Sequence, residues 1–255
     1  MARISIDGFV IRGFSMGETS RVISLFTEQR GKIKGVAKGV RKSASAKGGA
    51  LELFSRVRCN IYLKENVELG TISSVDLLQD YSKIAADPLK FGFCSAYFEI
   101  IDKLTTIDQA IPELYQLTSD FLQTILSADS KVVPVLFWAS FLKALSIVGY
   151  EPNLFECVVC GKHNDGKAAY YDPQKGGIIC AKDLLEHVQY GKLSKQALSM
   201  LQRFIAEPIT KLSQIIADQK LLGEIEQFIT GFADYHTGLR RDLKSFKFLS
   251  QIKEK

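Results

Sequence analysis

The stretch RGKIKGVAKGVRKSASAKGGALELFSRVR, from Arg30 to Arg58, alternates basic with apolar residues and is punctuated by glycine. Nine of its side chains are Lys or Arg, and only Glu52 is acidic. Residues 1–80 hold 13 basic and 8 acidic side chains, whereas residues 81–255 hold 20 of each, so the net charge of +5 lies in the first third. This asymmetry indicates a polyanionic partner, because a cation placed on a phosphate releases condensed counterions. Since the charges alternate with apolar residues, we interpret the stretch as an ordered basic face for nucleic acid rather than a solvated loop.

The sequence on both sides of this stretch predicts five short strands separated by turns. Five strands in about 75 residues, with a longer insertion between the third and fourth, favour an OB-type β-barrel that presents strands and flanking loops to oligonucleotides. The insertion covers Lys38–Ala50 and is rich in Lys, Ser, Ala and Gly, so we expect it to be mobile without a ligand. The predicted strands are Ile4–Phe14, Ser20–Thr27, Lys32–Ala37, Ser55–Leu63 and Leu69–Leu77.

The fourth predicted strand shows the clearest alternation between two faces. Val57, Cys59 and Ile61 share one face, and Arg58 and Tyr62 share the other. Cations can hold phosphates there and an aromatic ring can stack on a base, although Tyr62 can equally cover a neighbouring domain. The predicted DNA-binding residues are Arg30, Lys32, Lys34, Lys38, Arg41, Lys42, Arg56, Arg58 and Tyr62.

After Asp80 the apolar spacing changes from two residues to three and four, which predicts helices. The chain is therefore expected to be α+β, with an OB-type domain over 1–80 and a helical domain over 81–255 that is interrupted by an insertion at 153–183. No stretch approaches the about 20 apolar residues of a membrane span. The predicted helices are Pro88–Leu104, Ile111–Leu126, Val133–Val148, Ala181–His187, Ser194–Ala206 and Lys220–Tyr235.

Within the insertion, Cys157-Val-Val-Cys160 and Cys180-Ala-Lys-Asp183 have the spacing of a zinc ribbon with Asp in the fourth position. Two such pairs on tight turns let four ligands converge on one ion. His163 and His187 are alternative fourth ligands, and a packed cluster without metal is the other interpretation. A structural role is favoured over a catalytic one, because neither an HExxH motif nor a deaminase signature occurs.

The rest of the sequence offers little catalytic chemistry. It has no P-loop and no GxSxG motif, and its three histidines suggest no triad, so we expect a protein that is not an enzyme and has no small-molecule substrate. An odd number of cysteines, with Cys59 and Cys94 isolated in apolar surroundings, predicts two buried thiols and a reducing cytoplasm. The N-terminus lacks the apolar region of a signal peptide.

Motifs along nearly the whole chain resemble the RecO family of bacterial recombination mediators. Their order and spacing, rather than any one motif, carry the resemblance. They include Gly17-Glu18-Thr19-Ser20-Arg21, Gly31-Lys32-Ile33, Ala37-Lys38-Gly39-Val40-Arg41-Lys42-Ser43, Phe98-Glu99, Gly149-Tyr150-Glu151-Pro152, Cys157-x-x-Cys160-Gly161, Gly176-Gly177-x-x-Cys180, Tyr235-His236 and Leu243-Lys244-Ser245-x-Lys247-Phe248-Leu249.

The resemblance implies an N-terminal OB barrel, a helical domain and a zinc-binding knuckle. It also implies a nucleoid-associated, non-enzymatic protein that binds single- and double-stranded DNA and anneals complementary strands. With RecR, such a protein helps to load RecA onto DNA coated with single-strand binding protein, whose C-terminal tail is a further partner. Asp183 departs from the four-cysteine pattern of the family.

Three other functions remain as alternatives. The barrel can be a protein-interaction module with incidental nucleic-acid affinity, or an RNA-binding OB protein, although the large helical domain does not suit the latter. An enzyme that uses the cysteine site ranks last. Weak dependence of affinity on salt would favour the interaction module, because phosphate contacts make binding strongly salt-dependent.

Overall fold

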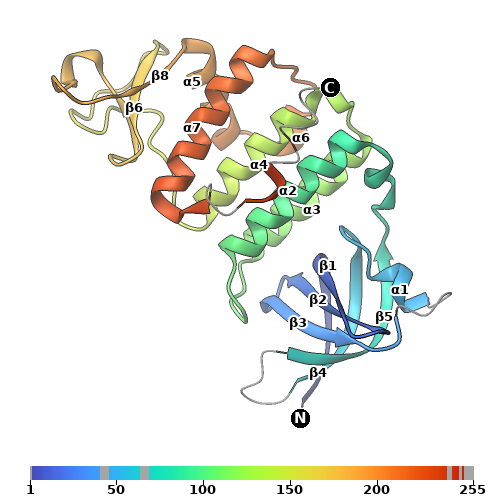
Figure 1. Ribbon diagram of the computed structural model, residues 1–255. Coiled ribbons are helices and arrows are strands. Elements are labelled where there is room, and N and C mark those ends of the chain that lie inside the picture. The colour runs from blue at the N-terminus through green and yellow to red at the C-terminus, as the bar shows by residue number, and fades with distance from the viewer. Residues whose placement is uncertain (1, 41–45, 64–68, 240–242, 247–248, 250–255) are drawn as a thin grey trace. The chain divides into compact units, whose positions relative to one another are not determined.

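The computed structural model describes residues 2–40, 46–63, 69–239, 243–246 and 249 (Figure 1). Contacts between residues divide the chain into two compact units. Unit 1 comprises Met1–Leu126 and Leu249–Lys255, and unit 2 comprises Ser127–Phe248. The predicted positions Arg41 and Lys42 lie outside the described residues.

Unit 1 contains a closed five-stranded barrel with the strand order β1-β2-β3-β5-β4 (Figure 1). Its pairs are antiparallel except for the parallel pair of β3 and β5. The predicted barrel is confirmed, and each predicted strand falls within two residues of an observed one. The strands are β1 (Ala2–Met16), β2 (Ser20–Thr27), β3 (Gly31–Ala37), β4 (Arg56–Leu63) and β5 (Leu69–Gln79).

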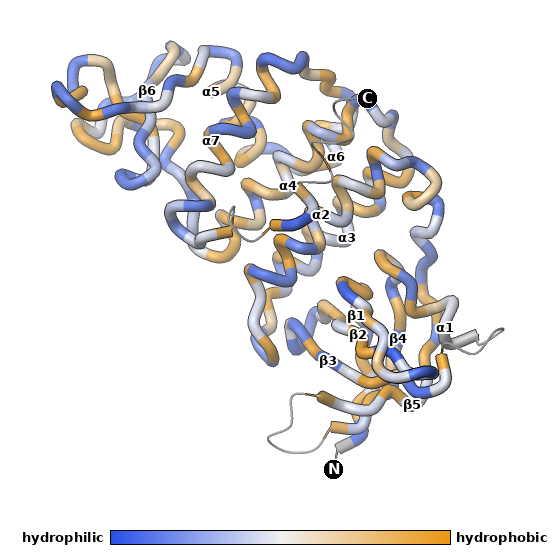
Figure 2. Tube along the Cα trace, in the orientation of Figure 1, coloured by the Kyte–Doolittle hydropathy of each residue, from blue (hydrophilic) through white to orange (hydrophobic). Residues whose placement is uncertain are grey.

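Buried apolar side chains fill the barrel. Hydrophilic and hydrophobic residues both occur along each of its strands (Figure 2). Val57, Cys59 and Ile61 of β4 are fully buried, as their spacing predicts. Burial raises the pKa of the Cys59 thiol to about 12, so this group is a neutral core residue. Cys94 on α2 (Pro88–Leu104) is also fully buried. Leu51, which follows the short helix α1 (Ala46–Ala50), belongs to the same barrel core.

A second apolar layer lies outside the barrel and joins it to two helices of unit 1, α2 and α3 (Pro112–Ser127). Phe9 and Phe26 lie 5.0 Å and 5.9 Å from the ring of Tyr115 on α3. Phe54 lies 5.1 Å from Phe98 on α2. These three phenylalanines are almost completely buried, because the helices cover this side of the barrel.

The core of unit 2 is built around α4 (Val133–Ile147), which packs against α5 (Lys195–Ala206), α6 (Ile209–Leu212) and α7 (Gln219–Thr237). Together with the turn before it, α4 is long and apolar enough to cross a membrane by length and composition alone. This differs from the expectation that no stretch approaches the length of a membrane span. Most of its side chains are buried inside unit 2, including Phe137, Trp138 and Phe141, so α4 is a core helix.

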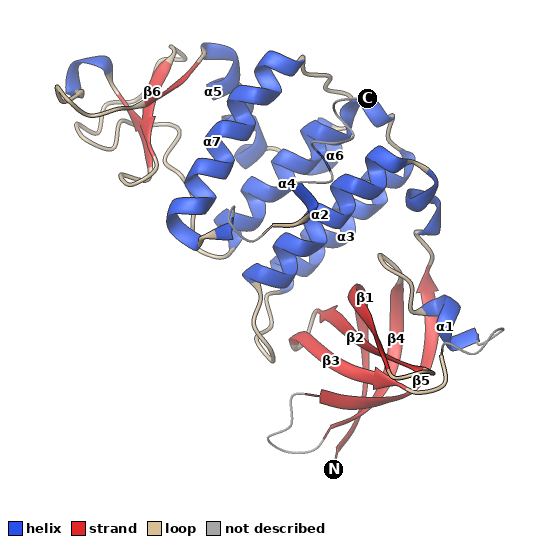
Figure 3. Cartoon of the chain, viewed as in Figure 1, coloured by secondary structure: helices blue, strands red, loops and turns tan. Residues whose placement is uncertain are grey.

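A small three-stranded sheet with the order β7-β6-β8 lies within unit 2 (Figure 3). Its strands are β6 (Ala169–Asp172), β7 (Gly177–Ile179) and β8 (Gly191–Leu193). The predicted helix over Ala181–His187 is wrong. A single 3₁₀ turn covers Ala181–Asp183, and the chain then becomes extended at Leu184. This short turn leaves Asp183 close to Cys180, to which its backbone N–H donates a hydrogen bond of 3.0 Å.

Candidate metal centre and nucleic-acid interface

The four predicted metal ligands converge in unit 2. The Sγ atoms of Cys157, Cys160 and Cys180 and a carboxylate oxygen of Asp183 all lie within 4.8 Å of one another. Cys157 donates from Sγ to Oδ2 of Asp183 at 3.3 Å. The same sulfur accepts the backbone N–H of Cys180, also at 3.3 Å.

Two tight segments bring these ligands together. After Cys160 the chain turns through Gly161, which has a φ of 68° and donates its N–H to the carbonyl of Cys157 at 2.8 Å. A side chain at Gly177 would overlap the carbonyl oxygen of Asn153. Both positions disfavour larger residues, so glycine at each permits the backbone path that brings the ligands together.

The surroundings of Cys157 lower the pKa of its thiol. Burial alone raises the pKa of this thiol, but the backbone N–H groups of Cys160, Cys180 and Val159 hold the pKa below its ordinary value. Burial together with the neighbouring sulfurs raises the pKa of Cys180 to about 11. A hydrogen bond from Cys160 lowers the pKa of the Asp183 carboxyl. Without a cation, thiolates packed this closely destabilise one another.

Three sulfurs and one carboxylate at this spacing suit a tetrahedral ion, for which Zn–S bonds of about 2.3 Å place the ligand atoms roughly 4 Å apart. The cluster can therefore hold a metal ion. Asp183 belongs to it, whereas His163 and His187 do not. Sequence spacing found all four members of this group.

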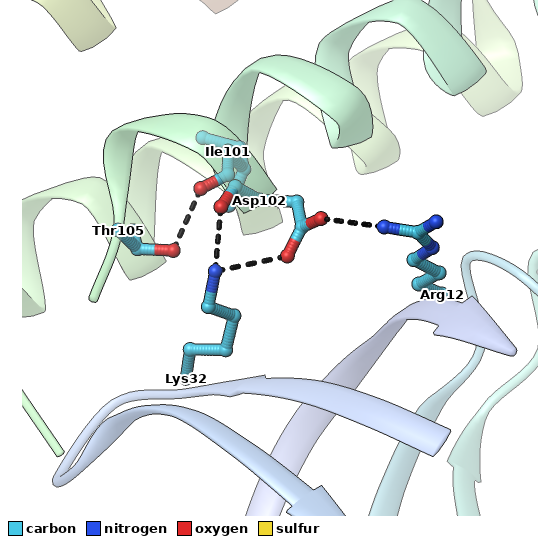
Figure 4. A network of polar contacts seen from close by, with 5 residues as sticks. All are labelled: Arg12, Lys32, Ile101, Asp102 and Thr105. Atoms are coloured by element: carbon cyan, nitrogen blue, oxygen red, sulfur yellow. Dashed lines mark hydrogen bonds and ion pairs between the residues drawn. The ribbon is translucent and has the colours of Figure 1, made fainter. Parts of the chain in front are cut away.

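The basic residues of unit 1 are arranged differently from the expectation of one continuous face. Lys32 on β3 points toward α2, where Nζ donates to the carbonyl oxygen of Asp102 at 2.6 Å and to its Oδ1 at 3.0 Å (Figure 4). The other carboxylate oxygen of Asp102 accepts from Arg12 on β1 at 3.4 Å. Only 13% of the Lys32 side chain is exposed, so it connects the barrel to α2.

We expect Asp102→Ala to lower the free energy of unfolding by about 2 kcal/mol, because it leaves the largely buried Lys32 ammonium with one partner fewer. Arg12 is 63% exposed, and Arg12→Ala should cost less than about 0.5 kcal/mol since exposed ion pairs contribute little. Urea unfolding of both variants measures the difference. Equal losses would show that Lys32 is not the residue that depends on Asp102.

Three more of the predicted DNA-binding cations have partners within unit 1. Arg58 lies opposite Asp7 on β1 and Asp76 on β5, and donates two hydrogen bonds of 2.7 and 2.9 Å to Asp7. These bonds lower the pKa of the Asp7 carboxyl. Arg30 pairs with Asp108 at 2.6 Å. The guanidinium of Arg56 lies 5.9 Å from the centre of the Tyr115 ring.

The remaining described positions are more open. Lys34 and Lys38 form no ion pair with any other residue that the structure describes, and Lys38 is exposed. Tyr62 on β4 lies directly opposite the exposed Arg3 on β1. Sequence reasoning missed Arg3, because the antiparallel register of β1 and β4 places it beside Tyr62 from 59 residues away in the chain.

Comparison with known proteins adds to this geometry. The family model for the N-terminal part of recombination protein O matches residues 1–81, and the model for its C-terminal part matches residues 85–245. The chain belongs to the RecO family. Curated relatives named DNA repair protein RecO include that of Thermoanaerobacter sp. (strain X514), 28% identical over 253 residues and 99% of each chain. The relative from Bifidobacterium longum is 33% identical over 180 residues, which are 69% of this chain and 72% of that protein.

The two family models together cover the barrel and the part of the chain that holds the cysteine cluster. The RecO relative from Geobacter sulfurreducens is 28% identical and also covers 99% of each chain. The match therefore extends over the barrel, the helices and the segment that contains the cysteines and the small sheet, rather than over one module.

Proposed function

We propose that this protein is a non-enzymatic recombination mediator that binds single- and double-stranded DNA without reading sequence. The observation that carries the proposal is the closed five-stranded barrel, in a chain of the RecO family, with Lys34 on β3 and Lys38 just after it, neither of which pairs with an acidic residue in the part of the chain that the structure describes. The proposed contact residues are Lys34 and Lys38, and also Arg3 and Tyr62 on the β1–β4 pair, which β2 and β5 separate from β3. Lys32 and Arg56 instead contact the helices of unit 1, Lys32 through Asp102 on α2 and Arg56 through Tyr115 on α3.

The surface suits strand annealing. Lysines on phosphates position a strand but carry no sequence information, so two strands of any sequence can be held side by side. Arg58 and Arg30, whose own side chains are exposed, contribute by exchanging their carboxylate partners for phosphates, because ion pairs at the surface are held weakly. Complementary strands that are held loosely in this way pair with each other.

The proposed partners are those of a mediator. The protein acts with RecR on DNA coated with single-strand binding protein, contacts the C-terminal tail of that protein, and thereby helps RecA to load. This work takes place on the nucleoid in the cytoplasm of a bacterium.

The proposed metal is zinc in a structural role. Zinc prefers thiolate ligands in tetrahedral sites, and the group of three sulfurs and a carboxylate matches that preference. When bound, the ion supplies positive charge that stabilises the thiolates. Cys157 is 2% exposed, which suits a residue that holds the β6–β7–β8 module together.

An annealing assay tests the proposal. Complementary oligonucleotides, bare or coated with single-strand binding protein, are mixed with the protein over a salt series without ATP. We expect accelerated annealing that persists on coated strands and weakens with salt. Affinity that barely changes with salt would favour the protein-interaction module instead, and stronger binding to RNA than to DNA would favour the RNA-binding alternative.

Charge reversal tests where DNA binds. Lys34→Glu with Lys38→Glu should lower the affinity for single strands about 100-fold, and should make the slope of log K against log salt shallower by about 1.4. Lys211→Glu with Lys220→Glu makes the same change in net charge at exposed positions of unit 2, and should have much less effect. Equal losses in the two double variants would place the DNA elsewhere.

A further inference from the structure

The five cysteines of the chain fall into two groups in the structure. Cys59 and Cys94 are completely buried in unit 1, where solvent does not reach them. The other three, Cys157, Cys160 and Cys180, lie together in unit 2 with their sulfurs within 4.8 Å of one another. Their role as metal ligands does not explain why solvent reaches these three so unequally.

Cys157 and Cys160 differ sharply in their access to solvent. Cys157 is 2% exposed, whereas Cys160 lies exposed at the surface. The turn that carries Cys160 is open, since Val159 is 48% exposed and nothing lies within 4 Å of a Cβ built at Gly161. Because the oxidation of a thiol depends on its exposure, a small oxidant in solution meets the sulfur of Cys160 before that of Cys157.

One closed turn holds these two cysteines together. The N–H of Cys157 donates to the carbonyl of Lys162 at 2.9 Å, and the N–H of Gly161 donates to the carbonyl of Cys157 at 2.8 Å. In a tight turn the first and fourth Cα atoms lie closer than about 7 Å, which is the span of a disulfide. A bond between the two sulfurs therefore needs rotation of the side chains more than movement of the backbone. Cys180 reaches the cluster from a separate segment.

We propose that Cys157 and Cys160 form a reversible disulfide when the protein meets hydrogen peroxide, and that this modification releases the metal. The thiolate of Cys160 attacks a peroxide oxygen, so that an S–O bond forms, the O–O bond breaks and hydroxide leaves. The thiolate of Cys157 then attacks the sulfur of this sulfenic acid, so that the S–S bond forms and a second hydroxide leaves. The two thiolates lose two electrons, the peroxide gains them, and two protons from solvent convert the hydroxides to water.

The disulfide removes half of the ligand set. Cys180 and Asp183 alone remain, whereas structural zinc is almost always four-coordinate. A carboxylate is also a less favourable ligand for zinc than a thiolate, so the remaining pair holds the ion weakly. The disulfide itself depends on neither the DNA-binding function nor the metal, and only the release of an ion rests on the zinc proposed above.

The test treats the full-length protein with hydrogen peroxide and follows thiols and zinc together. We expect the thiols of the subsequently unfolded protein to fall from five to three, while a colorimetric indicator detects released zinc at the same rate. Peptide mapping should find the bond between Cys157 and Cys160, and dithiothreitol with added zinc should reverse both changes. Cys59 and Cys94 are the internal control, because buried thiols should stay reduced.

Two matched variants test the assigned pair. Cys180→Ser keeps both partners and should still lose two thiols to peroxide. Cys160→Ser lacks the exposed sulfur and should lose thiols about tenfold more slowly. Each variant removes one metal ligand, so the thiol count, which does not need the ion, decides between them. Equal rates in the two variants would overturn the assignment of Cys160.

The outcomes for wild type separate this modification from the metal. Protein that contains no zinc but forms the disulfide between Cys157 and Cys160 would refute the proposed metal and support the modification. Protein that keeps its zinc and all five thiols under peroxide would refute the modification alone. Loss of the thiols of Cys59 and Cys94 at the same rate would also refute it, because the oxidation would then not be directed by exposure.

Discussion

Gly31→Ala should lower the free energy of unfolding by about 4 kcal/mol. The loss has two causes: alanine disfavours the left-handed backbone conformation at this position, and its methyl group would overlap a neighbouring loop. Gly31 begins β3 with a φ of 59°, a region that costs L-residues about 1–2 kcal/mol. In addition, a Cβ there would overlap the carbonyl oxygen of Gln109, in the loop between α2 and α3. The methyl group can fit only if that loop moves away from the barrel.

That movement would break a set of backbone contacts within unit 1. Lys32 donates its N–H to the carbonyl of Thr106 at 3.4 Å and accepts the N–H of Asp108 at 3.2 Å. The loop and the start of β3 are therefore joined directly, next to the ion pair of Arg30 and Asp108. Urea unfolding followed by circular dichroism measures the expected loss.

Gly17 provides the matched control. Its φ of 63° is almost the same, but nothing lies within 4 Å of the Cβ that alanine would add. Gly17→Ala should cost only the backbone term of about 1–2 kcal/mol. The difference between the two variants isolates the close approach of the α2–α3 loop to β3. Equal losses would mean that the loop yields without cost.

Loss of the metal should have the second largest effect. Structural zinc contributes on the order of 10 kcal/mol to the folding of small zinc domains, so we expect a chelator or Cys157→Ser to destabilise unit 2 by at least about 3 kcal/mol. The strands of the β6–β7–β8 module are only three or four residues long, so their hydrogen bonds alone stabilise it weakly. Thermal unfolding with and without chelator, together with the zinc content of the purified protein, measures the effect.

Combining the two perturbations provides the control. A chelator should not destabilise Cys157→Ser further, because the ion is already lost. If the chelator leaves wild type unchanged, the cluster is held by packing and binds no structural metal. Cys157→Ser protein that remains folded should retain annealing activity, whereas loss of a turnover without loss of stability would favour a catalytic site.

Several parts of the molecule follow from local sequence. The alternation of Val57, Cys59 and Ile61 predicts which face of β4 is buried, because side chains on a strand point alternately to its two sides. The start of α2 follows from Asp87, whose carboxylate accepts the backbone N–H of Leu89 at 2.9 Å, with Pro88 in the first turn. The domain boundary near residue 80 stays a prediction.

The cysteine cluster was also predictable, because a two-residue spacing within each ligand pair constrains how a tight turn can present them. The helix predicted over Ala181–His187 is wrong, because local apolar spacing was the basis of that prediction. Its apolar spacing is helical, but the chain after Asp183 extends, so that Asp183 stays with the cysteines.

The sequence by itself thus determined the five barrel strands, most helices and the four clustered ligands, but not the three strands of the small sheet in unit 2, since periodicity and spacing report how neighbouring side chains point. Only the tertiary structure decided which cations are available. Lys32 meets Asp102 and Arg58 meets Asp7 across 70 and 51 residues of chain. Arg21 pairs with Glu52 across 31 residues. Such pairs depend on strand register and on helix packing against the barrel, which no local pattern encodes. For this reason some cations of the charge-rich stretch pair within the protein, whereas others stay open to a ligand.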